Sequence, residues 1–285
     1  MSLRENLSLA LKVSRFRFWF YLTGPFTVGC IYGASRYLDL LNIWFFVYLL
    51  YFLFPANIFL YGVNDFWDFE TDLLNPKKEE KEYRVQVGEK NRLGEILRII
   101  TGLSLIILPF MSSNGERGIF LLFLFLSYFY SAKPLRFKEK PILDSASNLL
   151  YILPGVLAYY WVSGVLPPNL ILLAGGLHSF AMHLFSAIPD IEYDKNTGIN
   201  TSAVFFGRKT SLIVCLIAWS IFASIVISVG GSSVFRFLPL IYPVMVLNVL
   251  LQDLKVDEVY WYYPYINVGF GGFLFLLKAI QTPWA

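Results

Sequence analysis

Charged residues and cysteines are scarce in this chain, and both shortages limit the classes of protein to which it can belong. Only 15% of the 285 residues are charged and 56% are hydrophobic, whereas a soluble globular domain is about 25% charged and about 45–50% apolar. Its two cysteines, Cys30 and Cys215, lie far apart in apolar stretches, without Cys-x-x-Cys or Cys/His spacing. This pattern indicates buried thiols rather than a disulfide framework or a zinc site. The composition predicts an all-α, polytopic membrane protein.

Long apolar stretches make up most of the chain. Nine of them have roughly the twenty residues that a helix needs to cross a bilayer. We place them near 18–36, 41–63, 95–113, 117–133, 143–164, 170–189, 211–230, 234–252 and 262–281. We expect one transmembrane domain over residues 1–285 and no cleavable signal peptide, because the N-terminal segment is polar and basic.

Basic residues are distributed unevenly over the predicted loops. Of the 23 lysines and arginines, 19 fall on the N-terminal side of the membrane. The opposite side has only Arg36, Arg117, Arg236 and Lys278. Because cytoplasmic loops carry the excess of Lys and Arg, we place the N-terminus and the acidic clusters described next in the cytoplasm.

An acidic cluster at residues 64–72 follows the second apolar segment. Read as one helix, the sequence stacks Asn64, Asp68 and Asp72 along one side, since they are spaced i, i+4, i+8. Asp65 lies three residues before Asp68. Like charges so placed repel one another unless a cation lies among them. The pattern favours a bound metal ion.

A second cluster, with Asp190 and Asp194, follows the sixth segment. Magnesium prefers oxygen ligands and usually takes one or two carboxylates plus substrate phosphates. The alternative is that both clusters are solvated helix ends, where a charge costs little. Two clusters at equivalent places favour a divalent-metal diphosphate site over that alternative.

Cations follow both the first cluster and the fourth apolar segment. Lys133, Arg136 and Lys138 form a basic run, and Arg offers a planar fork that suits phosphate oxygens. Lys77 and Arg84 lie in a loop of mixed charge and are further candidates for diphosphate contact. Anionic lipid headgroups are the rival partner of such loops.

The two histidines lie in the sixth segment. His178 and His183 are five residues apart and do not share a helix face, so packing or hydrogen bonding is expected rather than metal binding. His183, about two turns before Asp190, is the better functional candidate.

Three motifs in order resemble the UbiA superfamily of intramembrane prenyltransferases. They are Asn-Asp-x-x-Asp-x-x-x-Asp at 64–72, Tyr-Ser-x-x-Pro-x-Arg-x-Lys at 130–138 and Asp-x-x-x-Asp at 190–194. The resemblance covers the whole chain and implies a helical bundle around a central cavity that opens to lipid. It implies that both acidic motifs bind a prenyl diphosphate through Mg²⁺.

The site residues expected from motifs and resemblance together fall into three groups. The metal ligands are Asn64, Asp68, Asp72, Asp190 and Asp194. The catalytic carboxylates are Asp65, Asp68, Asp190 and Asp194, with Asp65 and Asp72 as ligand, supporting group or base. The substrate-binding residues are Asn64, Tyr130, Lys133, Arg136, Lys138, Lys77 and Arg84.

A finer resemblance concerns the acceptor. Quinone-pathway members commonly have an Arg-Pro-rich stretch after the first motif, whereas this chain has Asn-Pro-Lys-Lys at 75–78. With residues 185–192 and 198–201, this is similar to the carotenoid-modifying branch, the lycopene elongases. We expect Mg²⁺-dependent transfer of a prenyl group to a hydrophobic acceptor in the membrane, lycopene or a related carotenoid.

Other functions stay open at this point. Within the family, the alternatives are prenylation of an aromatic quinone precursor or of a glycerol-phosphate lipid. CDP-alcohol phosphotransferases need Asp-Gly-x-x-Ala-Arg, which neither acidic cluster contains. A transporter would place ionisable groups near mid-membrane, not at one face. The expected partners are prenyl diphosphate, acceptor and membrane lipid, with no nucleic acid.

Overall fold

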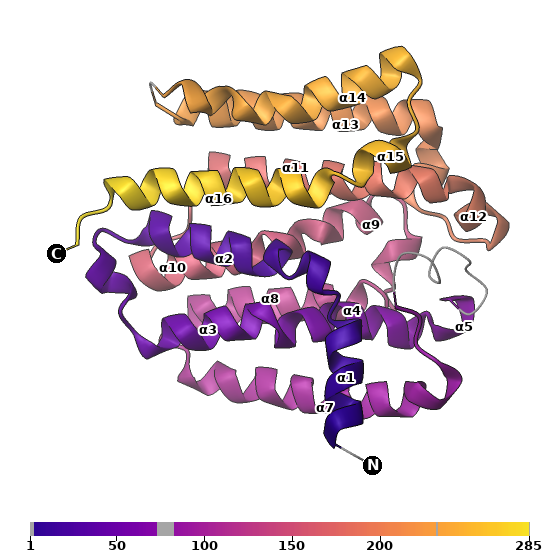
Figure 1. Cartoon of the computed structure of the whole chain (residues 1–285), viewed down its shortest axis with the longest axis horizontal. Coiled ribbons are helices and arrows are strands. Elements are labelled where there is room, and N and C mark those ends of the chain that lie inside the picture. Colours follow the sequence, from indigo (N-terminus) through magenta and orange to yellow (C-terminus); the bar gives the residue numbers. More distant parts are fainter. Residues whose placement is uncertain (1–2, 73–82, 232, 285) are drawn as a thin grey trace. The chain divides into compact units, whose positions relative to one another are not determined.

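The computed structural model describes residues 3–72, 83–231 and 233–284 of the chain. All regular elements in these ranges are α- or 3₁₀-helices, and no strand occurs among them, which confirms the predicted all-α class. The chain forms two compact units, which we describe separately (Figure 1). Unit 1 comprises Met1–Leu135, Leu153–Val165 and Gly271–Ala285, and unit 2 comprises Arg136–Ile152 and Leu166–Phe270.

Unit 1 contains most of the N-terminal helices. They are α1 (Leu3–Val13), α2 (Phe20–Gly33), α3 (Ile43–Leu53), α4 (Pro55–Trp67), α5 (Phe69–Asp72), α7 (Lys90–Ile107), α8 (Asn114–Phe129) and α10 (Leu153–Ser163). Helix α4 packs against α7 and α8, and α1 crosses α4 and α7 steeply (Figure 1). Buried residues of α1 and α4, among them Val13, Phe59 and Val63, form one apolar cluster with Leu93 of α7. This cluster fixes the end of α4 that carries the first acidic motif.

Proline 55 divides the second apolar segment into α3 and α4. Proline has no backbone N–H and ends the preceding helix, so the chain leaves helical geometry at Phe54, with φ −126° and ψ −62°. The side-chain amide of the buried Asn57 donates to the carbonyls of Phe52 at 2.9 Å and Leu53 at 3.0 Å. Asn57 thus binds carbonyls at the break that a continuous helix would have bonded internally.

Helices α2 and α10 approach closely through glycines. A Cβ on Gly29 would lie 2.2 Å from the carbonyl oxygen of Gly155, and one on Gly155 would lie 2.8 Å from that of Pro25. Small residues allow such backbone contact between membrane helices. This glycine contact fixes α10 against α2 within unit 1.

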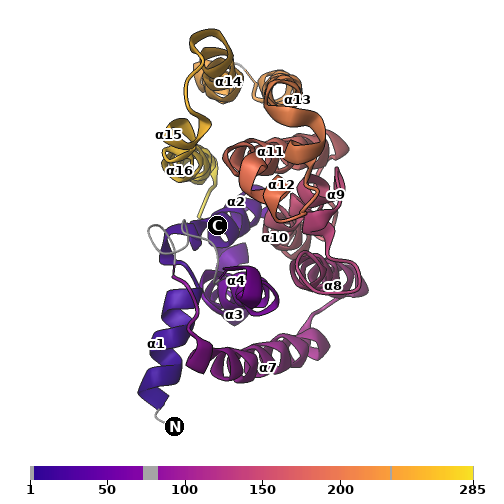
Figure 2. The same cartoon turned by 90° about the vertical axis from the view of Figure 1, so that its right-hand side faces the viewer.

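Unit 2 contains α9 (Leu143–Ala146), α11 (Asn169–Ala187), α12 (Ile191–Asn196), α13 (Ser202–Val229), α14 (Ile241–Gln252) and α15 (Val256–Tyr260). Helix α16 (Tyr263–Gln281) begins in unit 2 and ends in unit 1. Helices α13 and α14 run antiparallel (Figure 1) and lie side by side when viewed nearly end-on (Figure 2). The core of unit 2 is aromatic, with Trp219 stacked on Tyr242 and Tyr263.

Six helical stretches of the described chain are long and apolar enough to cross a membrane, namely Ile43–Trp67, Val87–Phe110, Asn169–Asn196, Ser202–Val229, Val234–Gln252 and Val256–Gln281. The other predicted segments, 18–36, 117–133 and 143–164, coincide with shorter helices. Nine crossings and the central cavity stay predictions.

The apolar segment predicted near 143–164 is divided between α9 and α10. The chain turns through a 3₁₀-helix, Ser147–Tyr151, between α9 and α10. The Ser147 hydroxyl and the Asn148 amide both donate to the Asp144 carbonyl, at 3.1 and 2.6 Å. Such local bonds compete with the regular helix.

Candidate active site

The first acidic motif lies at a break between two helices of unit 1. Helix α4 ends at Trp67, and Asp68 has φ −96° and ψ 4°, after which α5 begins. The Thr71 hydroxyl donates to the Asp68 carbonyl at 2.8 Å, a side-chain bond that favours a turn over a continuing helix. The predicted single helix through 64–72 is therefore wrong at Asp68, although Asn64 and Asp68 remain one turn apart.

Asp65 forms an ion pair with Arg15. Arg15 Nη2 lies 2.7 Å from Asp65 Oδ1, and the two side chains are 13% and 3% exposed. The same guanidinium lies over the Tyr61 ring, 4.9 Å from its centroid. The sequence does not indicate this pairing, because 50 positions separate Arg15 from Asp65. The ion pair assigns Asp65 first to binding Arg15.

Asn64 is oriented by the basic motif that ends α8. Its side-chain Nδ2 donates to Ser131 Oγ at 2.9 Å, so its carbonyl Oδ1 is the atom suited to a cation. Ser131 is buried and follows Tyr130, which caps α8 and is half-buried. Unit 1 thus brings together the first acidic motif and the start of the basic one.

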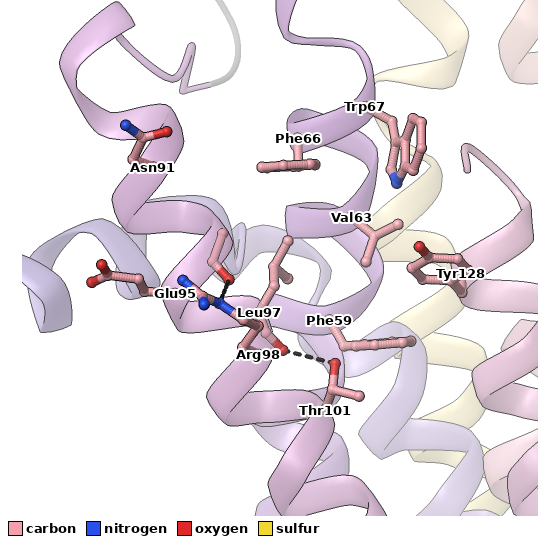
Figure 3. Close-up of a pocket in the computed structure, with 11 residues that line it drawn as sticks. Phe59, Val63, Phe66, Trp67, Asn91, Glu95, Leu97, Arg98, Thr101 and Tyr128 are labelled. Atoms are coloured by element: carbon pink, nitrogen blue, oxygen red, sulfur yellow. Dashed lines mark hydrogen bonds between the residues drawn. The ribbon is translucent and has the colours of Figure 1, made fainter. Parts of the chain in front are cut away.

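A groove of about 860 Å³ borders the same end of α4. Phe59 and Phe66 of α4 lie on one side of it, and Arg98 and Thr101 of α7 on the other (Figure 3). Phe66 and Trp67 of the first acidic motif line the groove, but its carboxylates Asp65 and Asp68 do not.

The second acidic motif repeats the local geometry of the first. Helix α11 ends at Ala187, a 3₁₀ turn covers Ile188–Asp190, and α12 follows. Asp190 has φ −94° and ψ 0°, within a few degrees of the backbone at Asp68. Pro189 explains this break, since a proline ends the helix before it. The two acidic motifs, which follow equivalent apolar segments, thus share their local backbone geometry.

Asp194 is held by the turn that follows α12. Gly198, with φ 76°, places its N–H on the Lys195 carbonyl, and the Ile199 N–H donates to the Asp194 carbonyl at 2.8 Å. These two bonds define a Schellman motif, which needs a residue like glycine in the left-handed conformation. Thr201 is the N-cap of the next helix, α13, and its hydroxyl donates to Asp194 Oδ2 at 3.3 Å. The sequence Gly-Ile-Asn-Thr at 198–201 therefore fixes the second carboxylate.

The basic motif continues into unit 2 with Arg136. Its backbone is left-handed, with φ 42°, and its Nε lies 2.5 Å from Glu139 Oε1. The Arg136 side chain is 13% exposed, Lys138 is half-buried and Lys133 is exposed. Arg136 and Lys138 are therefore closer to the protein interior than Lys133 is.

Two of the predicted site residues lie wholly or partly outside the described residues. Lys77 lies outside the described residues, and Asp72 ends α5 but its side chain lies outside them. Arg84 is described and half-buried. A cation that we had not assigned to the site, Lys90, lies over the Phe69 ring at 4.7 Å, beside the first motif.

The two histidines have different surroundings. His178 accepts a hydrogen bond from Trp219 Nε1 at 3.2 Å within the aromatic core, which confirms a packed, hydrogen-bonded role. His183 Nε2 lies 3.9 Å from Oδ2 of Asp144, a fully buried carboxylate that we did not select from the sequence. An acidic residue at the start of an otherwise apolar segment was the available signal for Asp144.

The donor atoms fit magnesium rather than a metal that needs a full protein cage. No group of three or more His, Cys, Asp or Glu side chains that suits a metal ion occurs in the described part of the chain. Magnesium needs only one or two carboxylates and completes its shell with water and phosphate oxygens. The side chains of Asn64, Asp68, Asp190 and Asp194 each have an oxygen atom of the kind that magnesium prefers.

Long apolar helices, with an acidic motif at each of two helix breaks, define an integral, multi-pass membrane protein. Residues 22–255 match the model of the UbiA prenyltransferase family. The chain belongs to this family and is a prenyltransferase, which confirms the prediction.

Curated relatives and a solved structure of the same family resemble the chain over most of its length. The chain is 41% identical over 262 residues to "Lycopene elongase/hydratase" of Halobacterium salinarum, covering 91% of this chain and 92% of that one. It is 40% identical over 276 residues to the protein of the same description from Haloarcula japonica, with 96% and 92% covered. A UbiA homolog from Archaeoglobus fulgidus bound to DMAPP and Mg²⁺ has a TM-score of 0.71 at 18% identity, covering 95% of this chain and 99% of that one. At this identity the last comparison shows the fold alone.

Proposed function

We propose that the chain transfers a prenyl group from dimethylallyl diphosphate to lycopene or a related polyene, in a Mg²⁺-dependent reaction. The observation that carries the proposal is about 40% identity to lycopene elongase/hydratases over more than nine-tenths of this chain. The Archaeoglobus homolog binds DMAPP and Mg²⁺, which supports the choice of donor and metal.

The metal ligands in this proposal come from the two acidic motifs. Asn64, Asp68 and Asp72 of the first motif, and Asp190 and Asp194 of the second, bind Mg²⁺. Asp65 has a catalytic role by keeping Arg15 at the first motif, as their 2.7 Å contact supports. Because the matched region runs from 22 to 255 and includes parts of both units, we further propose that the chain acts as a single prenyltransferase domain.

Cations of the basic motif bind the diphosphate. Arg136 and Lys138 are the principal contacts, since a guanidinium pairs with two phosphate oxygens and an ammonium supplies a point charge. Tyr130, Lys133, Lys77 and Arg84 are the remaining substrate-binding residues of the proposal. Magnesium, when bound, neutralises negative charge on the diphosphate and makes it a better leaving group.

The transfer breaks one bond and forms another. The allylic C–O bond breaks, the diphosphate leaves with the electron pair, and the terminal double bond of the acceptor attacks the allylic carbon. The new C–C bond leaves a tertiary cation, which loses a proton or takes up water. The apolar helices exclude bulk water, so the allylic cation is trapped by the acceptor before it is hydrolysed.

The scarcity of cations inside the spans supports a polyene acceptor. A phenolic acid needs a Lys or Arg for its carboxylate, but the predicted spans offer mainly Phe, Leu, Ile, Tyr and Trp away from their ends. A polyene gains affinity from buried apolar area, at roughly 25 cal/mol per Å². We also propose that the N-terminus and both acidic motifs face the cytoplasm, as the 19 of 23 basic residues on that side support.

Expression in cells that make lycopene tests the proposal. Extracts analysed by mass spectrometry should contain products one or two five-carbon units heavier than lycopene, with or without added water. Cells with the Asp190→Ala variant at equal membrane abundance are the control. Unchanged lycopene, together with prenylated 4-hydroxybenzoate or a prenylated glycerol phosphate, would refute the polyene acceptor.

A further inference from the structure

Asp144 of α9 is a fully buried carboxylate, and two of the groups that donate hydrogen bonds to it belong to one residue, Ser202. Its Oδ2 accepts the backbone N–H of Ser202 at 2.7 Å, and its Oδ1 accepts the Ser202 hydroxyl and the Ser145 N–H, the latter at 2.7 Å. Burying a carboxylate is costly unless donors satisfy it. Asp144 is therefore tied to the first turn of α13, where N–H groups lack partners within the helix.

The same contacts hold the loop that carries Arg136 and Lys138. At the end of this loop the Ile142 N–H donates to the Ser202 hydroxyl oxygen at 2.6 Å, and the Asp144 N–H donates to the Lys140 carbonyl at 2.9 Å. Ile142 has φ 72°, a conformation that a β-branched residue rarely adopts. Such backbone persists only where surrounding contacts enforce it. Ser202, held by Asp144, supplies that contact.

The second acidic motif is attached to the same helix start. Thr201, next to Ser202, donates its hydroxyl to Asp194 Oδ2 at 3.3 Å and accepts the Val204 N–H at 3.3 Å. The residue that caps α13, Thr201, therefore contacts a proposed metal ligand, and the first residue of α13, Ser202, contacts the basic loop. Both arrangements depend on where α13 begins.

We propose that Asp144 is a positioning residue for diphosphate binding. Through Ser202 it fixes the basic loop, and through the adjacent Thr201 it fixes Asp194. It does not contact the substrate itself. This inference rests on the proposed function and adds to it a residue outside the three motifs.

The experiment compares buried serines that differ in their bonds. Ser202→Ala removes the hydroxyl that joins Asp144 to Ile142. Ser211→Ala, on the same helix, and Ser145→Ala, next to Asp144, remove buried hydroxyls that make no hydrogen bond within the described part of the chain. Each full-length variant is purified, and Mg²⁺-dependent binding of the unreactive analogue dimethylallyl thiodiphosphate is measured by calorimetry.

Ser202→Ala should weaken analogue binding, and raise the Mg²⁺ concentration for half-saturation, by about 10-fold, the lower end of the effect of residues that support metal ligands. In turnover, KM for the donor diphosphate should rise while KM for the polyene stays constant. Ser202→Thr, which keeps a hydroxyl, should recover most of the affinity. If Ser202 had a purely structural role, Ser202→Ala would lower the folded fraction. The analogue affinity and the Mg²⁺ concentration for half-saturation of the folded protein would then stay unchanged.

The two failures are separable. If the wild type binds the analogue but Ser202→Ala binds it as tightly as Ser211→Ala does, Asp144 has no positioning role and the inference is overturned alone. If the wild type does not bind the analogue at any Mg²⁺ concentration, the proposed function fails and the inference fails with it. Asp144→Asn replaces one accepting oxygen by an amide nitrogen, which cannot accept from Ser202 or Ser145. In folded protein this variant should weaken analogue binding more than Ser202→Ala does.

Discussion

The pair between Arg15 and Asp65 offers the sharpest test of how unit 1 is stabilised. Replacing Arg15 by Met keeps the length and apolar stem of the side chain but leaves the carboxylate, 3% exposed, without this cation. Removing one partner of a buried ion pair costs about 3–5 kcal/mol. Because Arg15 is itself 13% exposed, we expect a loss near the lower end, about 3 kcal/mol of unfolding free energy.

A second ion pair of the N-terminal region provides the control. Arg92 of α7 lies 3.3 Å from Glu5 of α1, but these side chains are 31% and 52% exposed. Exposed pairs contribute about 0–1 kcal/mol, so Arg92→Met should cost about 1 kcal/mol or less. The two variants remove the same charge and differ in burial.

The assay can use a cysteine already present in unit 1. Cys30 of α2 is a buried free thiol, and Cys215→Ser leaves it as the only cysteine of the chain. Maleimide labelling of Cys30 during SDS titration in mixed micelles then follows the unfolding of unit 1. The double variant Arg15→Met/Asp65→Asn should recover part of the loss, because no charge is left unpaired. An Arg15→Met loss no larger than that of Arg92→Met would refute the argument.

Three further predictions concern the site, the membrane orientation and the packing. Asp68→Ala and Asp190→Ala should each abolish turnover without reducing membrane insertion. EDTA should abolish turnover of the wild type until Mg²⁺ is restored. Near-normal activity of Asp68→Ala at saturating Mg²⁺ would contradict the metal site. In a cysteine-free chain, Lys140→Cys should be labelled from the cytoplasm and Leu166→Cys from outside, and the reverse would overturn the topology. Gly155→Val should lower the thermal midpoint through a loss of about 1–3 kcal/mol, because even a Cβ would lie 2.8 Å from the Pro25 carbonyl oxygen, whereas Gly24→Ala, with nothing within 4 Å of its Cβ, should not.

Features that depend on neighbours in the sequence could be predicted. Long apolar runs predicted the helices, and Pro167-Pro168 and Gly230-Gly231 fall where α10, α11 and α13 begin or end. The acidic motifs marked the ends of the apolar segments, because charged side chains interrupt an apolar span. The break at Asp68 was missed, since the i, i+4 pattern of carboxylates fits a helix whether or not Thr71 binds the Asp68 carbonyl.

Contacts between distant residues could not be predicted in the same way. Arg15 is one of 19 basic residues assigned to the same side, and nothing local distinguishes it as the partner of Asp65. Asp144 lies next to small polar residues that read as a helix start, while its main partner, Ser202, is 58 positions later. The packing of the helices selects such pairs, and periodicity carries no information about them.

The separation of Asp144 from Ser202 also has a consequence for biosynthesis. A ribosome adds about 5–20 residues per second, so Ser202 is made roughly 3–12 s after Asp144, given the 58 positions between them. During that interval the loop that ends at Ile142 has been synthesised without the hydroxyl that supports its left-handed backbone. The nascent chain therefore completes this loop only after α11 and the start of α13 have been synthesised, and a chain truncated before Ser202 lacks the contact altogether.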